Sequence, residues 1–231
     1  MRTLISLVAA LAMTVLFTQC KKSNDKKPSC RIITVTPAPN GTPFHFTYNA
    51  DGKPSRVESS SFVTTFEYSP GSAIIVTFNS GNFQSKTTAT LNQDGLATNV
   101  RTELDTLGTN WSNVFYEYNG QELSKSTLTS SAGGRPVINT YTWSNHNLVL
   151  SSTDSSSETF GYYTNKPVQT GDYFLLVQDL QGYAIYRNQN LLKSIDATSL
   201  NYDFGTDGKI NSLSATTGAN ETFLNYEYQC D

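Results

Sequence analysis

A short phrase, in which two aromatic residues alternate with a polar one and a tight-turn pair follows, recurs along this 231-residue chain. Aromatic residues two positions apart share one face of a strand, and Asp-Gly or Asn-Gly suits the reversal between two strands. The chain is therefore predicted to form β-hairpins joined in sequence. The clearest copies lie at residues 46–53, 66–71, 116–120, 141–145, 202–209 and 226–228.

Alternation of apolar and polar residues extends well beyond these phrases and predicts strands with one drier and one wetter face. Consecutive hairpins pair with the least loop entropy, so we expect an all-β antiparallel meander. It should contain roughly 13–15 strands, curled or closed into a barrel-like sheet. Asp51-Gly52, Asp94-Gly95, Asn119-Gly120 and Asp207-Gly208 suit two-residue turns in which both residues have positive φ. The candidate strands are 32–35, 44–49, 56–60, 62–68, 73–78, 85–91, 98–104, 113–118, 123–129, 137–143, 148–153, 158–163, 199–204, 210–215 and 222–228.

One stretch departs from the period of two and predicts a short helix near residues 172–181. Asp172 suits its start and Gly182 its end. We expect the helix to cover or plug one end of the sheet; a strand is the alternative for this apolar run. Apolar residues at i, i+3, i+4 and i+7 form its apolar face: Tyr173, Leu176, Val177 and Leu180.

The N-terminal segment predicts export. Residues 1–19 combine Arg2 with an apolar run of signal-peptide length, too short to span a bilayer as a helix. Residues 17–20 resemble a bacterial lipobox, which would make Cys20 the lipidated residue and residues 20–29 a polar tether. The alternative is an ordinary secretory signal that leaves Cys20 as a free thiol.

Cysteine arithmetic agrees with lipidation. The chain has three cysteines. If Cys20 carries the lipid, Cys30 and Cys230 remain and can pair with each other. An oxidising compartment favours a disulfide between them, and the alternative is two separate thiols. The bond would bring the first and last strands together.

The composition limits the number of domains and the kinds of partner that this chain can have. Residues 30–231 suffice for a single all-β domain. The net charge of −3 and the absence of a basic cluster argue against a nucleic-acid partner.

Nothing in the sequence assembles a catalytic, cofactor or metal site, so we expect no enzyme activity and no cofactor. His45 falls on a wetter strand face and His146 in a turn. A single carboxylate per turn cannot supply the oxygens that calcium needs. A glycosidase would need two nearby carboxylates, for which the polar-face candidates are Glu67, Glu117 and Glu227.

The aromatic residues two apart have three uses that the sequence leaves open. Packing in the core is the simplest one. Stacking on the sugar rings of a glycan is the second, and an aromatic girdle facing lipid in an outer-membrane channel is the third. The candidates for ligand stacking are Tyr48, Tyr68, Tyr118, Trp143 and Tyr228.

The repeated Tyr-x-x-Asp-Gly-Lys phrase, at 51–53 and in related form at 207–209, resembles the YD repeats of bacterial surface proteins. With the lipobox-like residues 17–20 and the phrases at 163–167 and 188–195, the layout resembles a Bacteroidetes-type lipoprotein family of unknown function. That resemblance implies a porin-like all-β fold in the cell envelope. The family has no established activity to carry over.

These observations predict a lipid-anchored cell-envelope protein with a non-enzymatic binding or scaffold role towards a glycan or protein partner. The alternatives are an envelope glycoside hydrolase and an outer-membrane channel. Lys21-Lys22 lacks the acidic run that resembles a surface-export signal, which favours the periplasmic face of the outer membrane over the cell surface. Asp105-Thr106-Leu107 resembles a short O-glycosylation acceptor.

Overall fold

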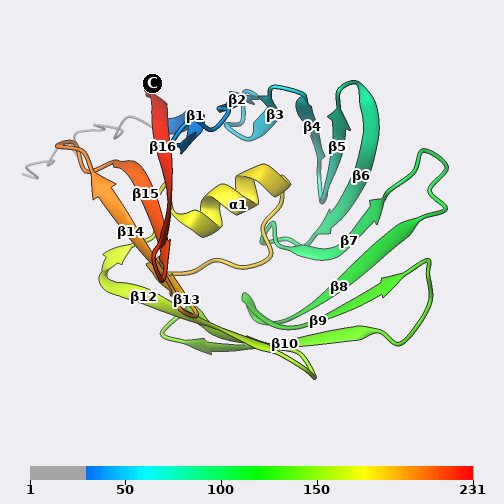
Figure 1. Ribbon diagram of the computed structural model, residues 1–231. Coiled ribbons are helices and arrows are strands. Elements are labelled where there is room, and N and C mark those ends of the chain that lie inside the picture. Colours follow the sequence, from blue (N-terminus) through cyan, green and yellow to red (C-terminus); the bar gives the residue numbers. More distant parts are fainter. Residues whose placement is uncertain (1–29, 231) are drawn as a thin grey trace, which may run out of the picture.

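The protein is a closed antiparallel barrel of sixteen strands with one helix inside it (Figure 1). The structure, a computed structural model, describes residues 30–230; the signal segment, Cys20 and the tether predicted for residues 1–29 lie outside them. The strands are β1 (Cys30–Ala38), β2 (Phe44–Tyr48), β3 (Pro54–Ser59), β4 (Phe62–Ser69), β5 (Ser72–Asn79), β6 (Asn82–Leu91), β7 (Ala97–Glu103), β8 (Trp111–Asn119), β9 (Glu122–Ser130), β10 (Val137–Ser144), β11 (Asn147–Ser152), β12 (Ser157–Pro167), β13 (Asn190–Ile195), β14 (Thr198–Phe204), β15 (Ile210–Thr217) and β16 (Asn220–Cys230), with helix α1 (Tyr173–Gln181) between β12 and β13.

The predicted all-β meander and its closure are confirmed, because each strand pairs with its sequence neighbours and β1 pairs with β16. Sixteen strands exceed the predicted count by one. The additional strand is β13, which follows the helix and pairs with β12 and β14.

A disulfide closes the barrel. Cys30 faces Cys230 in the β1–β16 register, and their sulfur atoms are bonded across a sequence separation of 200 residues. The predicted disulfide is thus confirmed. Both chain ends of the barrel consequently lie at the same rim, where β16 ends beside β1 (Figure 1).

We call this rim the turn mouth, because it also holds the β2–β3, β6–β7 and β14–β15 turns; the opposite rim is the loop mouth. Each of the three turns has five residues and the same two hydrogen bonds. The N–H of its first residue donates to the carbonyl of its fifth residue, and the N–H of its fourth residue donates to the carbonyl of its first. Only the glycine of each Asp-Gly pair has positive φ. The predicted two-residue turns are therefore wrong here, and longer turns with a left-handed glycine take their place. These turns span residues 49–53, 92–96 and 205–209.

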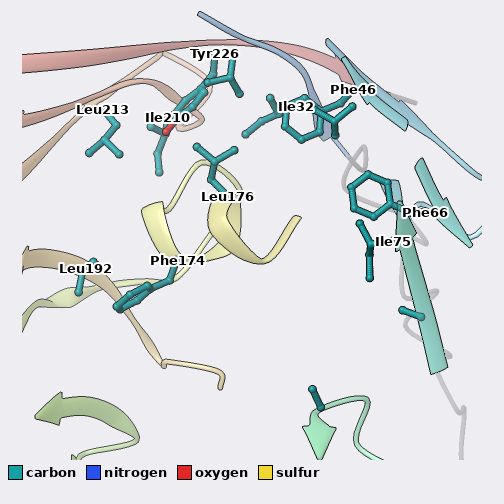
Figure 2. Packing of buried hydrophobic residues seen from close by; sticks show 14 of the residues in the cluster. Ile32, Phe46, Phe66, Ile75, Phe174, Leu176, Leu192, Ile210, Leu213 and Tyr226 are labelled. Carbon is teal, nitrogen blue, oxygen red and sulfur yellow. The ribbon is translucent and has the colours of Figure 1, made fainter. Parts of the chain in front are cut away.

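Helix α1 lies inside the ring of strands and confirms the predicted helix over the alternative strand. Asp172 is its N-cap and Gly182, with φ of 76°, its C-cap. The predicted apolar face is only partly correct. Phe174 and Leu176 are the buried helix residues, and they point to different parts of the wall (Figure 2), whereas Leu180 is 39% exposed. The barrel wall encloses the helix on more than one side, and the helix ends near the turn mouth. Its buried residues therefore do not lie along a single amphipathic stripe.

The two faces of the barrel wall differ in polarity. Inward residues such as Phe46, Phe66, Ile75 and Tyr226 are buried in one apolar cluster with α1 (Figure 2). Alternate residues face outward, and they include charged side chains such as Glu117 and exposed apolar ones such as Phe115 and Phe223. Within residues 30–230, no helix is long and apolar enough to cross a membrane.

Candidate binding site at the turn mouth

Two adjoining hollows lie at the turn mouth and share one side chain, Asp179 of α1. The first, of about 410 Å³, is lined by the start of β1, Tyr48 and the β2–β3 turn. The second, of about 190 Å³, is lined by Lys53, Tyr68, the β6–β7 turn and the end of α1. Because both hollows include Asp179, its carboxylate is the common element of this site.

The Asp179 carboxylate is held in an unfavourable environment. Burial alone raises its pKa to about 6. Among residues 30–230, no donor is found at hydrogen-bond distance from it, in contrast to the Asp172 carboxylate on the same helix. Its position in the last turn of α1 adds the negative end of the helix dipole. A ligand that donates hydrogen bonds would relieve this unfavourable environment.

Tyr48 and Tyr68 flank Asp179, one in each hollow. Burial, followed by the charge of Asp179, raises the pKa of both hydroxyls, to about 12 for Tyr68. The Tyr48 hydroxyl donates to the Ile32 carbonyl at 2.5 Å, which fixes its ring. Basic groups lie over both rings, with the Arg31 guanidinium carbon 5.4 Å and the Lys53 Nζ 4.9 Å from the ring centroids. The site thus combines an acceptor, donors and aromatic surface.

The other predicted stacking residues have well-defined structural contacts. The Tyr118 hydroxyl donates to the Ala97 and Ile185 carbonyls at 2.7 and 3.0 Å, and Trp143 Nε1 donates to Leu123 O at 2.7 Å. Both residues therefore tie elements of the barrel together.

Tyr228 belongs to the turn mouth but to a third hollow. Its hydroxyl donates to the Ile210 carbonyl at 2.7 Å. The ring lines a hollow of about 720 Å³ beside Lys209 and the disulfide. Of the five predicted aromatics, the structure therefore brings Tyr48 and Tyr68 together around Asp179.

The carboxylates considered for hydrolysis lie on the outer wall. Glu67, Glu117 and Glu227 are exposed and alternate with inward aromatic residues on β4, β8 and β16, which are not neighbouring strands. Glu117 forms an ion pair with Lys125 at 2.7 Å. The structure therefore does not gather them into a concave site.

The two histidines are also separated from the site. His45 is exposed on β2, and His146 Nδ1 in the β10–β11 turn lies 3.3 Å from a Glu122 carboxylate oxygen. In the part of the chain that the structure describes, no group of three His, Cys, Asp or Glu residues could hold a metal ion.

Sequence reasoning missed Asp179. The available signal was an acidic residue in the last turn of a predicted helix, where the dipole disfavours a negative charge. That position on a helix usually faces solvent, so the signal becomes informative only once the wall encloses α1.

Comparison with solved structures supports the fold. A porin-like protein from Bacteroides uniformis superposes with a TM-score of 0.58 at 16% identity, over 86% of this chain and 98% of that one. A porin-like protein from Bacteroides vulgatus gives a TM-score of 0.60 at 14% identity, over 87% of this chain and 99% of that one. No family model matches the sequence, and no curated protein matches it. At these identities the likeness establishes a shared porin-like barrel fold and nothing further.

Proposed function

We propose that this protein is a non-enzymatic, lipid-anchored barrel of the cell envelope that binds a glycan at the turn mouth. The observation that carries the proposal is the Asp179 carboxylate, which lies between Tyr48 and Tyr68 and has no hydrogen-bond donor among residues 30–230. Sugar hydroxyls donate to carboxylates, and sugar rings stack on aromatic faces. Lys53 would supply a donor for sugar oxygens.

The polarity of the wall favours a water-facing barrel over a channel embedded in lipid. Three ion pairs occupy outward positions on β3, β7 and β8–β9, with N···O distances of 2.8, 3.1 and 2.7 Å. A single Arg or Lys on the lipid face costs about 2–4 kcal/mol at the bilayer midplane. The apolar side of the wall instead faces inward onto α1. These ion pairs support the proposal that the outer wall of the barrel faces water.

The proposed anchor orients the site. Nine residues lie between Cys20 and Cys30, so the two are ten Cα–Cα steps apart, a span of at most about 36 Å when fully extended. Since Cys30 lies at the turn mouth, lipid on Cys20 would hold this mouth close to a membrane. The ligand would then be a glycan at or near the membrane surface, and the periplasmic face of the outer membrane is the favoured location.

Two experiments test this proposal. For the anchor, Cys20→Ser should abolish incorporation of labelled fatty acid and release the protein from the membrane fraction. Unchanged labelling and fractionation would contradict lipidation.

For binding, the purified protein should bind a subset of bacterial envelope glycans on an array, and Asp179→Asn should weaken that binding at least ten-fold. Asp154→Asn is the matched control, because Asp154 is 82% exposed in the β11–β12 loop at the other mouth. A protein that binds no glycan, or binds equally well after Asp179→Asn, would refute the proposed function.

A further inference from the structure

A further cavity, of about 300 Å³, lies on the opposite side of α1 from Asp179. Tyr173, Phe174 and Val177 of α1 line it, whereas Leu175 and Asp179 line the turn-mouth hollow. At 100° per residue, these two sets fall on opposite helix faces. The remaining lining comes from β10–β13 and the segment after α1, so the cavity is separate from the proposed glycan site.

Five of the eleven residues that line the cavity are aromatic, and the rings around Phe174 meet at steep angles. The Phe174 ring centroid lies 5.5 Å from that of Phe160, 6.0 Å from that of Tyr173 and 5.0 Å from that of Tyr186, with interplanar angles of 59°, 52° and 76°. Phe174 thus packs directly against three other rings, none of them in parallel, and the four rings form part of the cavity lining. Tyr141 is the fifth aromatic residue of the lining, and the aliphatic part of the lining comes from Leu148, Val177, Ile185 and Ile195.

Hydrogen bonds hold the aromatic residues of the lining in place. The Tyr141 hydroxyl shares a 2.9 Å hydrogen bond with the Ser126 hydroxyl. The Tyr186 carbonyl accepts from Gln178 Nε2 at 2.9 Å, which ties the segment after α1 back to the helix. The cavity is thus preorganised by contacts that do not involve a ligand.

Among residues 30–230, Glu158 is the carboxylate that lines this cavity, and it is exposed to solvent. Glu158 lines it on the loop-mouth side and is paired in register with Ser151, another lining residue. Burial and the neighbouring Asp196 raise the pKa of Glu158, and burial, Tyr141 and Glu158 raise that of Tyr186. Of the residues described between 30 and 230, no lysine or arginine lines this cavity.

We propose that this cavity binds a small organic cation, an ammonium group carried on an apolar body. Aromatic faces attract such cations, and most strongly where water is excluded. Glu158 would supply the opposite charge at the entrance, while the rings of Phe160 and Phe174 contact the apolar body. The site requires neither the lipid anchor nor the glycan site.

The test compares two probes of the same shape, benzyltrimethylammonium and its neutral isostere neopentylbenzene, by titration calorimetry on the purified protein. The cation should bind at least ten-fold more tightly. Glu158→Gln should lower the affinity for the cation five- to ten-fold and leave the affinity for the neutral probe unchanged. Glu67→Gln, an exposed glutamate on the outer wall, is the matched control and should change neither.

Absence of cation binding, equal affinity for the two probes, or full cation affinity in Glu158→Gln would each overturn the proposal. The Asp179→Asn variant separates the two sites, because it should leave the cation affinity unchanged while it weakens glycan binding. If Asp179→Asn weakens the cation instead, the probe binds at the turn mouth and the aromatic cavity is not its site.

Discussion

Replacing Asp179 with asparagine should stabilise the barrel at pH 8 but not at pH 4. The pKa of Asp179 is about 6 in the folded protein, against 3.8 for an ordinary aspartate. Between these two values the folded protein binds more protons than the unfolded chain, so the free energy of unfolding falls as the pH rises. The loss begins near pH 4 and is complete about one pH unit above 6.

The size of the effect follows from the pKa. A rise from 3.8 to about 6 corresponds to about 3 kcal/mol. Water reaches the carboxylate through the two hollows, which reduces the cost, so we expect Asp179→Asn to gain about 1–2 kcal/mol at pH 8. At pH 4 the carboxyl group is already protonated and neutral, and the gain should vanish.

Urea unfolding of wild type and variant at pH 4 and pH 8, with the disulfide oxidised, measures this difference. Trp111 and Trp143 supply the fluorescence signal. Asp154→Asn, which is highly exposed, should show no pH-dependent gain. The reasoning fails if Asp179→Asn is no more stable than wild type at pH 8, or if its gain is the same at both pH values.

Three further variants test contacts that hold the barrel and its helix together. Asp172→Ala should cost about 2–4 kcal/mol in urea unfolding, because the cap side chain accepts two helix N–H groups and one from β13; Asp172→Asn should recover part of this. Converting both Cys30 and Cys230 to serine should cost about 5 kcal/mol, since the bond closes a loop of 200 residues, and reductant should destabilise wild type alone. Gly182→Ala should lower the thermal midpoint more than Gly52→Ala. Both glycines have φ of 76°, but a Cβ at Gly182 would lie 2.5 Å from an aromatic carbon, whereas nothing lies within 4 Å at Gly52.

Most of the fold follows from local patterns in the sequence. On β8, Tyr116 and Tyr118 face inward and Glu117 faces outward, as the period of two predicts. Asp172 and Gly182 mark the helix ends because capping depends on only a few neighbouring residues. Such signals need no knowledge of distant partners.

Strand β13 could not be predicted in the same way. Leu191 and Leu192 are adjacent, yet both are fully buried, which breaks the alternation of a strand with one wet face. The register of β12 against β13 shifts between Gly161 and Tyr162 at this point. Pairing with a distant strand, and not a local pattern, makes this segment a strand.

The candidate sites depend on the same long-range closure. Asp179 lies far along the chain from Tyr48 and Tyr68, and only the enclosure of α1 by the wall brings the three together. Glu158 likewise becomes part of an aromatic cavity because α1 packs inside the barrel next to β12. The sequence shows the residues but not their proximity.

Helix α1 links the two proposed sites and also keeps them apart. One of its faces presents Asp179 to the turn mouth, and the other presents Phe174 to the aromatic cavity. Its start is fixed to β13 through the hydrogen bond from Leu192 N to the Asp172 carboxylate. We therefore expect that a ligand bound on one face of the helix does not move the helix. Coupling between sites requires an element with two arrangements of similar energy. Helix α1 is capped, packed and enclosed by the wall, so it has a single arrangement. We therefore expect the glycan and the cation to bind independently.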